Sequence, residues 1–143
     1  ALSMSFVMLD QDKALKILDV IYKHLYTPWG LRSLSPEDRE YHGFYGGSQK
    51  NRDLAYHQGT VWAYPLGAYY RARIRFAKDQ KEEIQNVKEQ LMAMDACIRE
   101  GCVGQIAEIY DGDRPVKSKG CFAQAWSVGE ILRVYDMIEK LER

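Results

Sequence analysis

The sequence predicts an all-α fold of about four helices. Four segments carry apolar residues at every third or fourth position, which is the spacing of an amphipathic helix. They are residues 11–25, 60–76, 80–100 and 123–141. Two long segments without this spacing, residues 27–59 and 101–122, separate the helices of each pair, and a short turn near Lys78 joins the two pairs. The order helix, long loop, helix therefore occurs twice.

Composition supports a single globular domain and excludes two classes of partner. The chain has 143 residues, of which 46% are hydrophobic and 28% are charged. Its formal net charge is zero and it has no basic stripe, so we expect no nucleic-acid partner. No apolar run approaches the roughly 20 residues that span a bilayer, and the segment Ala1–Leu9 lacks the basic flank of a signal peptide. We therefore expect no membrane partner.

The cysteines indicate a reducing compartment. Cys97, Cys102 and Cys121 are an odd number, and their spacing does not match a metal site. Reduced thiols are typical of cytoplasmic proteins. His57 has no second His or Cys at a suitable spacing, so we read it as a hydrogen-bonding side chain. We expect a cytoplasmic protein without a metal or another cofactor.

The first two helices have recognisable ends. Asp10 is a suitable N-cap for the first helix, and Thr27 followed by Pro28 ends it. Thr60 is a candidate N-cap for the second helix, because its hydroxyl can accept a hydrogen bond from a free backbone N–H. Pro65 then falls in the first turn, where its missing N–H costs least.

The last two helices continue the pattern. Residues 80–100 have the clearest periodicity, from Ile84 to Ile98, and Gly101 ends this helix. Residues 123–141 carry Val128, Ile131 and further apolar residues on one face. If successive helices are antiparallel, both long loops lie at the same end of the bundle. Long loops are often functional, so we expect the functional face there.

The stretch Tyr56-His57-Gln58-Gly59-Thr60-Val61-Trp62 combines hydrogen-bonding side chains with flat aromatic rings. One interpretation is a helix cap with aromatic packing. The other is a sugar site, because pyranose C–H faces pack on aromatic rings while hydroxyls bond polar groups. Trp29 and Trp126 lie in or beside the same long segments and are further candidate platforms, although either can also belong to the core.

Glu108 is the candidate catalytic carboxylate. It lies among Ile106, Ala107, Ile109 and Tyr110, and a carboxylate among apolar neighbours is suited to proton transfer. The alternative is a solvated loop glutamate. The neighbouring Asp111-Gly112-Asp113 lacks a full calcium-loop pattern, so we assign it to a turn.

Several ordered motifs together resemble the C-terminal glucosidase domain of glycogen debranching enzymes. They are Thr27–Leu34, Tyr56–Trp62, Tyr64–Gly67, Ile106–Gly112 and Gly120–Ser127. The resemblance covers nearly the whole chain. It implies an (α/α)6 barrel of the six-hairpin glycosidase type, of which residues 1–143 form a single C-terminal fragment, about the last third.

The resemblance also implies an activity. The family hydrolyses the α-1,6-linked glucose left at a trimmed branch point, so the expected partner is glycogen or another branched α-glucan. By resemblance, Glu108 is the general base of an inverting reaction. The general acid lies in the upstream part of the barrel, which is the second expected partner. The positions that match sugar-contacting or site-shaping motifs are Tyr56, His57, Gln58, Trp62, Gln124 and Trp126.

Other interpretations stay open. In Ala63-Tyr64-Pro65 the proline comes later than in many bacterial members, and this leaves the exact substrate preference open. The chain could be a non-catalytic helical module that binds glycan or protein, or a fragment of another helical-barrel glycosidase such as a trehalase relative. An isolated fragment would expose apolar helix faces, so self-association is expected.

Overall fold

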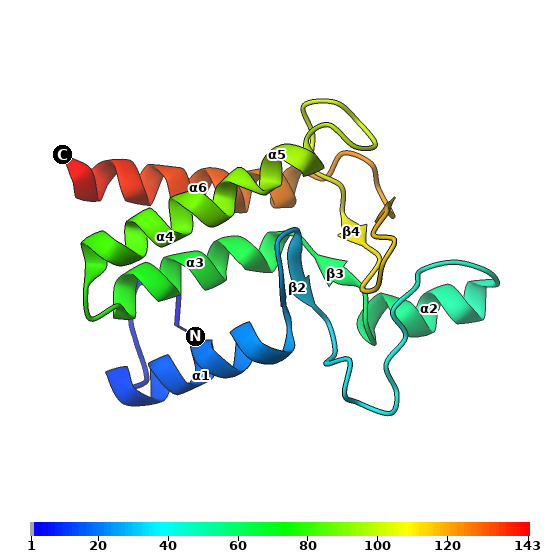
Figure 1. Cartoon of the computed structure of the whole chain (residues 1–143), viewed down its shortest axis with the longest axis horizontal. Helices are drawn as coiled ribbons and strands as arrows, with labels where there is room; N and C mark the ends of the chain where they lie inside the picture. Colours follow the sequence, from blue (N-terminus) through cyan, green and yellow to red (C-terminus); the bar gives the residue numbers. More distant parts are fainter. Residues whose placement is uncertain (1) are drawn as a thin grey trace.

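A computed structural model describes residues 2–143, and it places a layer of helices beside a small sheet (Figure 1). The helices are α1 (Gln11–His24), α2 (Gln49–His57), α3 (Tyr64–Phe76), α4 (Gln80–Met92), α5 (Met94–Cys97) and α6 (Ala125–Glu142). The strands are β1 (Tyr26–Thr27), β2 (Gly30–Arg32), β3 (Val61–Trp62), β4 (Ile109–Tyr110) and β5 (Ser118–Lys119). Among these residues, no helix has the length and apolarity needed to cross a membrane.

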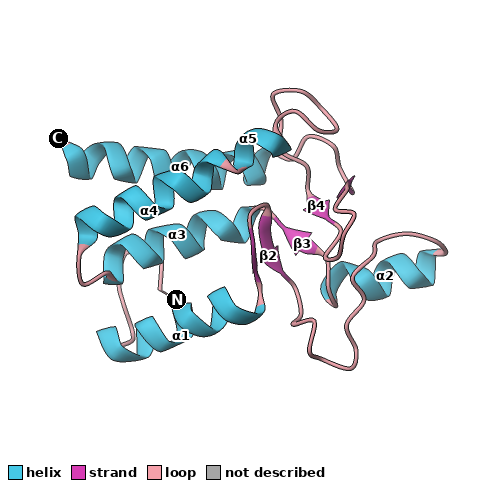
Figure 2. Cartoon of the chain, in the orientation of Figure 1, coloured by secondary structure: helices cyan, strands magenta, loops and turns pink. Residues whose placement is uncertain are grey.

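The prediction of an all-α fold, with about four helices from an (α/α)6 barrel, is wrong. The structure contains a sheet as well as helices. The five strands pair antiparallel in the order β1-β2-β3-β4-β5, as Figure 2 shows for the strands that it labels. Each strand has only two or three residues, which is too short for the apolar alternation that identifies a strand in a sequence. The pairing is set by contacts between distant segments instead.

The sheet brings the two long segments of the chain together. Leu31 of β2 pairs with Trp62 of β3, and Trp62 pairs with Ile109 of β4. Backbone hydrogen bonds extend this contact, because the Gly112 N–H donates to the Gly43 carbonyl at 2.7 Å. Segments that are tens of residues apart in the sequence therefore lie side by side at one end of the helices.

The helices share a core that is centred on α3. Helices α1, α4 and α6 all pack against α3, and Leu66, Tyr70 and Ile74 of α3 are fully buried. Helix α6 approaches especially closely, since a Cβ at Gly67 would lie 2.4 Å from the Glu130 carbonyl oxygen. Apolar burial of this kind is the main stabilising contribution in a small domain. This core also includes Val61 of β3 and Tyr110 of β4, so it joins the helices to the sheet.

The start of α1 matches the prediction, but the start of α3 does not. Asp10 accepts a hydrogen bond from the Lys13 N–H at 2.9 Å, as an N-cap should. Thr60 does not cap α3, which begins at Tyr64 with Pro65 in its first turn. The Thr60 hydroxyl instead donates to the Tyr56 carbonyl at 2.8 Å, and the chain then enters β3.

Two further differences concern helix boundaries. The predicted helix over residues 80–100 is divided, since α4 ends at Met92 and only the short α5 follows. Helix α2 lies within a segment predicted as a loop. Its one buried residue is Ala55, so it has no apolar stripe that a sequence pattern could reveal.

Candidate active site

The site begins at the end of α2, where the backbone carbonyl of Tyr56 accepts two side-chain hydrogen bonds. The Thr60 hydroxyl and the Trp62 indole N–H both donate to the Tyr56 carbonyl, at 2.8 and 3.0 Å. These two bonds connect the last turn of α2 to β3. They place the Tyr56 side chain beside the sheet.

Glu108 lies just before β4, and both of its carboxylate oxygens are hydrogen-bonded. The Tyr56 hydroxyl donates to Oε1 at 2.5 Å, and the Cys121 backbone N–H donates to Oε2 at 2.9 Å. Gly120 makes the second contact possible, because its φ is +66° and a Cβ there would lie 2.4 Å from Oε2. The half-buried carboxylate is therefore held in one orientation by donors from two distant segments.

The Tyr56 hydroxyl remains a donor at neutral pH. Burial, followed by its hydrogen bond to Glu108, raises the pKa of Tyr56 from 10.0 to about 12. A phenol with this pKa is protonated throughout the physiological range. Tyr56 therefore acts as a fixed hydrogen-bond donor to the carboxylate.

Aromatic rings gather next to this pair. The Trp62 ring centroid lies 4.6 Å from that of Tyr56, and the His57 ring stacks on Trp62 at 6.0 Å with an interplanar angle of 5°. Trp126, from the first turn of α6, lies 6.3 Å from Trp62 and 5.1 Å from Tyr64. Trp62 is buried, whereas Trp126 is 49% exposed.

These rings line a cavity of about 510 Å³, which we call the aromatic cavity. Tyr56, His57, Trp62, Tyr64 and Trp126 contribute to its wall, together with apolar residues of α1 and β2. Its volume lies in the range typical of small-molecule sites. Aromatic faces beside a few polar groups suit a ligand with both C–H faces and hydroxyls.

Comparison with known proteins identifies the family. The model of the amylo-alpha-1,6-glucosidase family matches residues 1–133. This chain belongs to that family. It is also similar to the glycogen debranching enzyme of Saccharomyces cerevisiae, with 25% identity over an alignment of 151 positions that covers 92% of this chain. The chain spans about 10% of the length of that relative. The predicted resemblance is thus confirmed.

Four of the residues that we predicted to contact sugar line the aromatic cavity of this amylo-alpha-1,6-glucosidase domain. They are Tyr56, His57, Trp62 and Trp126. Gln58 lines a neighbouring open cavity with residues of α2, and His57 lies on the wall of both cavities. Gln124 precedes α6, and its backbone N–H donates to the Ile106 carbonyl at 2.9 Å.

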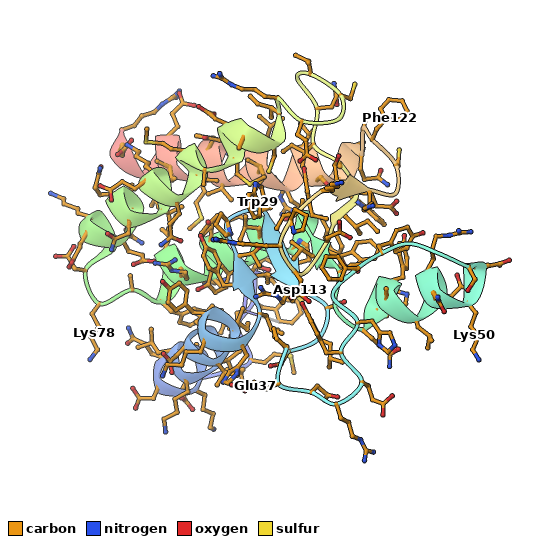
Figure 3. The ribbon with its side chains drawn as sticks, turned by 45° about the vertical axis from the view of Figure 1, so that its right-hand side comes forward. Trp29, Glu37, Lys50, Lys78, Asp113 and Phe122 are labelled. Atoms are coloured by element: carbon orange, nitrogen blue, oxygen red, sulfur yellow. The ribbon has the colours of Figure 1, made fainter. Side chains whose placement is uncertain are left out.

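Glu108 and Trp29 lie outside this wall. Glu108 is connected to the aromatic cavity through the Tyr56 hydroxyl. Trp29 lines a different, smaller cavity with Asp113, and Figure 3 labels both residues. Arg32 lines both of these cavities and therefore lies between them.

The sequence interpretation did not single out Tyr64 or Tyr45 for the site. Tyr64 is 39% exposed on the cavity wall, and the Tyr45 ring lies 5.9 Å from that of Tyr56. The position of Tyr64 directly after the Trp62 motif was a usable signal. Tyr45 is placed by the loop that folds over the turn after β4, and no local pattern marks it.

The two aspartates after β4 bind the segment that precedes α2. Asp111 is buried and accepts a hydrogen bond from the Tyr45 N–H at 2.9 Å. Asp113 accepts one from the Tyr41 hydroxyl at 3.0 Å. Both carboxylates therefore fasten the segment before α2 to this turn, which leaves Glu108 as the carboxylate beside the aromatic rings. Over residues 2–143, no three His, Cys, Asp or Glu side chains are grouped so that they could hold a metal ion.

Proposed function

We propose that this chain is part of a cytoplasmic glycoside hydrolase that removes α-1,6-linked glucose at glycogen branch points. Glu108 serves as the general base of an inverting acid/base reaction. One observation carries the proposal: both oxygens of Glu108 are hydrogen-bonded beside the aromatic cavity, in a chain of the amylo-alpha-1,6-glucosidase family. The 143 residues are the C-terminal part of the glucosidase domain of a longer parent.

The geometry of Glu108 suits a general base. A carboxylate has about four acceptor sites, and the two observed bonds use one on each oxygen. A free lone pair can therefore accept a proton from water. The resulting hydroxide attacks the anomeric carbon, the glycosidic C–O bond breaks, and the leaving oxygen takes a proton from the general acid. Donation from Tyr56 and Cys121 holds the carboxylate in one orientation, so that its free lone pairs keep a fixed direction.

The general acid comes from another part of the parent polypeptide. Asp111 and Asp113 are already bound to the Tyr45 and Tyr41 segments. In an inverting enzyme the acid lies roughly 6.5–9.5 Å from the base, so that a water fits between them. The 143-residue chain alone should therefore bind a glucan without hydrolysing it.

Substrate recognition uses the aromatic cavity. Trp126 and Tyr64 present exposed ring faces to the C–H faces of glucose, while His57 and Gln58 offer donors and acceptors to hydroxyls. A non-catalytic glycan-binding role is the second candidate, because the aromatic cavity offers ring faces and hydrogen-bonding groups whether or not the parent supplies an acid. A catalytic role requires that the parent also supply an acid.

The full-length parent should release glucose from a branched limit dextrin. Proton NMR of the first product should show the β-anomer, because inversion of an α-linkage produces it. Trp126→Ala in the parent should raise KM more than it lowers kcat. A parent that binds the dextrin without releasing glucose would favour the binding module. Initial release of α-glucose would contradict the inverting mechanism.

A further inference from the structure

A second cavity of about 500 Å³ lies between α1 and α4, and we call it the helical groove. Helix α3 forms its floor, and Figure 1 shows α3 between the two flanking helices. The groove reaches the turn between α3 and α4, which Lys78 marks in Figure 3. It shares no lining residue with the aromatic cavity. The groove is therefore a separate feature of the surface.

The floor of the helical groove carries a polar network rather than apolar side chains alone. Arg73 Nε lies 2.5 Å from Glu83 Oε1, and Arg73 Nη1 donates to Gln90 Oε1 at 2.7 Å. The Arg73 and Glu83 side chains are only 16% and 17% exposed. Desolvating such a pair is expensive, so apolar packing would be the simpler way to fill this space. A polar ligand in the groove could form hydrogen bonds with this network.

The charges around the groove do not favour an ionic ligand. Asp19 is paired with Lys23 at 2.7 Å, and Asp79 accepts a hydrogen bond from the Glu82 N–H at the start of α4. Arg73 and Glu83 neutralise each other. Lys78 lies among Asp79, Glu82 and Glu83 on the same wall, so acidic and basic groups are interspersed and no large field of a single sign develops. The groove therefore suits a neutral ligand with many hydroxyls.

An aromatic surface completes the match to a sugar. Tyr22 of α1 lines the groove and is 52% exposed. Its ring is supported by Tyr26, at a centroid distance of 5.2 Å. Across the groove, Asn86 of α4 is half-buried on the wall and offers an amide donor and acceptor. A pyranose ring can lie on Tyr22 while its hydroxyls bond Asn86 and the Arg73 network.

We propose that the helical groove is a second α-glucan-binding site, which holds a linear part of the polymer away from Glu108. The choice of α-glucan as ligand rests on the proposed function. Two weak sites on one polymer act together, because binding at one raises the effective concentration at the other. Loss of the groove should therefore weaken binding to glycogen more than binding to a short oligosaccharide.

Amide NMR of the 143-residue chain with maltoheptaose tests this proposal. Titration should move two groups of signals, one from α1 and α4 around Tyr22 and Asn86 and one around the aromatic cavity. Tyr22→Ala or Asn86→Ala should weaken binding at the first group by about threefold to tenfold, the loss of one aromatic contact or one hydrogen bond, and leave the second group unchanged. Trp126→Ala should have the opposite effect. Tyr135→Ala is the matched control, since Tyr135 is 49% exposed and lines neither cavity.

The possible failures are distinct. If the groove signals stay still while the aromatic-cavity signals saturate, or if both groove variants bind as the wild type does, the second site is refuted and the proposed function survives. If only the groove signals move, the aromatic cavity is not a glucan site and the proposed function loses its support. Spectral dispersion of each variant reports directly whether its fold is intact.

Discussion

Removal of the Tyr56 hydroxyl should break the hydrogen bond that connects the wall of the aromatic cavity to Glu108 and destabilise the fold. A hydrogen bond to a charged group contributes about 1.5–3 kcal/mol to stability. The Tyr56–Glu108 bond is short, at 2.5 Å, but Glu108 is half-buried, so water can partly replace the phenol. We therefore expect a coupling of about 1.5 kcal/mol, roughly a tenfold change in the unfolding equilibrium constant.

A double-mutant cycle measures this coupling. Urea unfolding of the wild type, Tyr56→Phe, Glu108→Ala and the double variant should show that the second substitution costs about 1.5 kcal/mol less after the first. Tyr41→Phe combined with Glu108→Ala is the matched control, because the Tyr41 hydroxyl binds Asp113 instead. If the effects of Tyr56→Phe and Glu108→Ala add to within about 0.5 kcal/mol, Tyr56 does not position Glu108.

Three further predictions concern the glycine beside Glu108, a buried thiol and the cavity wall. Gly120→Ala should destabilise the chain to urea more than Gly104→Ala. Both glycines have positive φ, which costs a side chain about 1–2 kcal/mol, but the Gly120 Cβ would also meet Glu108, whereas Gly104 faces open space. The temperature of thermal unfolding should fall as pH rises from 9 to 12, because burial raises the pKa of the Cys97 thiol from 9.0 to about 12. The stabilising contribution of the Cys97 thiol is complete below pH 9 and is lost as the pH rises from 9 to about 12. Cys97→Ala should therefore reduce the decrease in the unfolding temperature over this pH range. Trp126→Ala should reduce the tryptophan fluorescence change caused by a short α-glucan, and an unchanged response would remove Trp126 from the cavity wall that binds sugar.

Periodicity predicted the four long helices because each buries an apolar stripe. The segments that became α1, α3, α4 and α6 all contain such a stripe, and all four pack in one core. The sheet was not predictable in this way. A strand such as β3 has two residues, and its position depends on partners from two other parts of the chain. The same reason explains Thr60, where a tertiary contact with the Tyr56 carbonyl replaced the expected helix cap.

The candidate residues were visible in the sequence, but their connections were not. Tyr56 and Glu108 are 52 residues apart, and no local rule pairs them. The sequence predicted Tyr56 as a sugar contact, and the structure adds that its hydroxyl is bonded to Glu108. Gly120 is a further example, since only the folded chain reveals that the absence of a Cβ leaves room for the carboxylate. The sugar-binding roles of His57 and Trp126 stay predictions.

The central claim is that Glu108 is the general base, and the most direct measurement is the turnover of three variants of the full-length parent on one branched limit dextrin. Glu108→Gln keeps the size of the side chain but removes the basic oxygen, so it should lower kcat by about 10²–10⁴-fold and leave glucan binding nearly intact. Asp111→Asn and Asp113→Asn should have milder effects, because those carboxylates hold the Tyr45 and Tyr41 segments. Near wild-type turnover by Glu108→Gln, together with loss of activity in either aspartate variant, would assign the base to a different carboxylate.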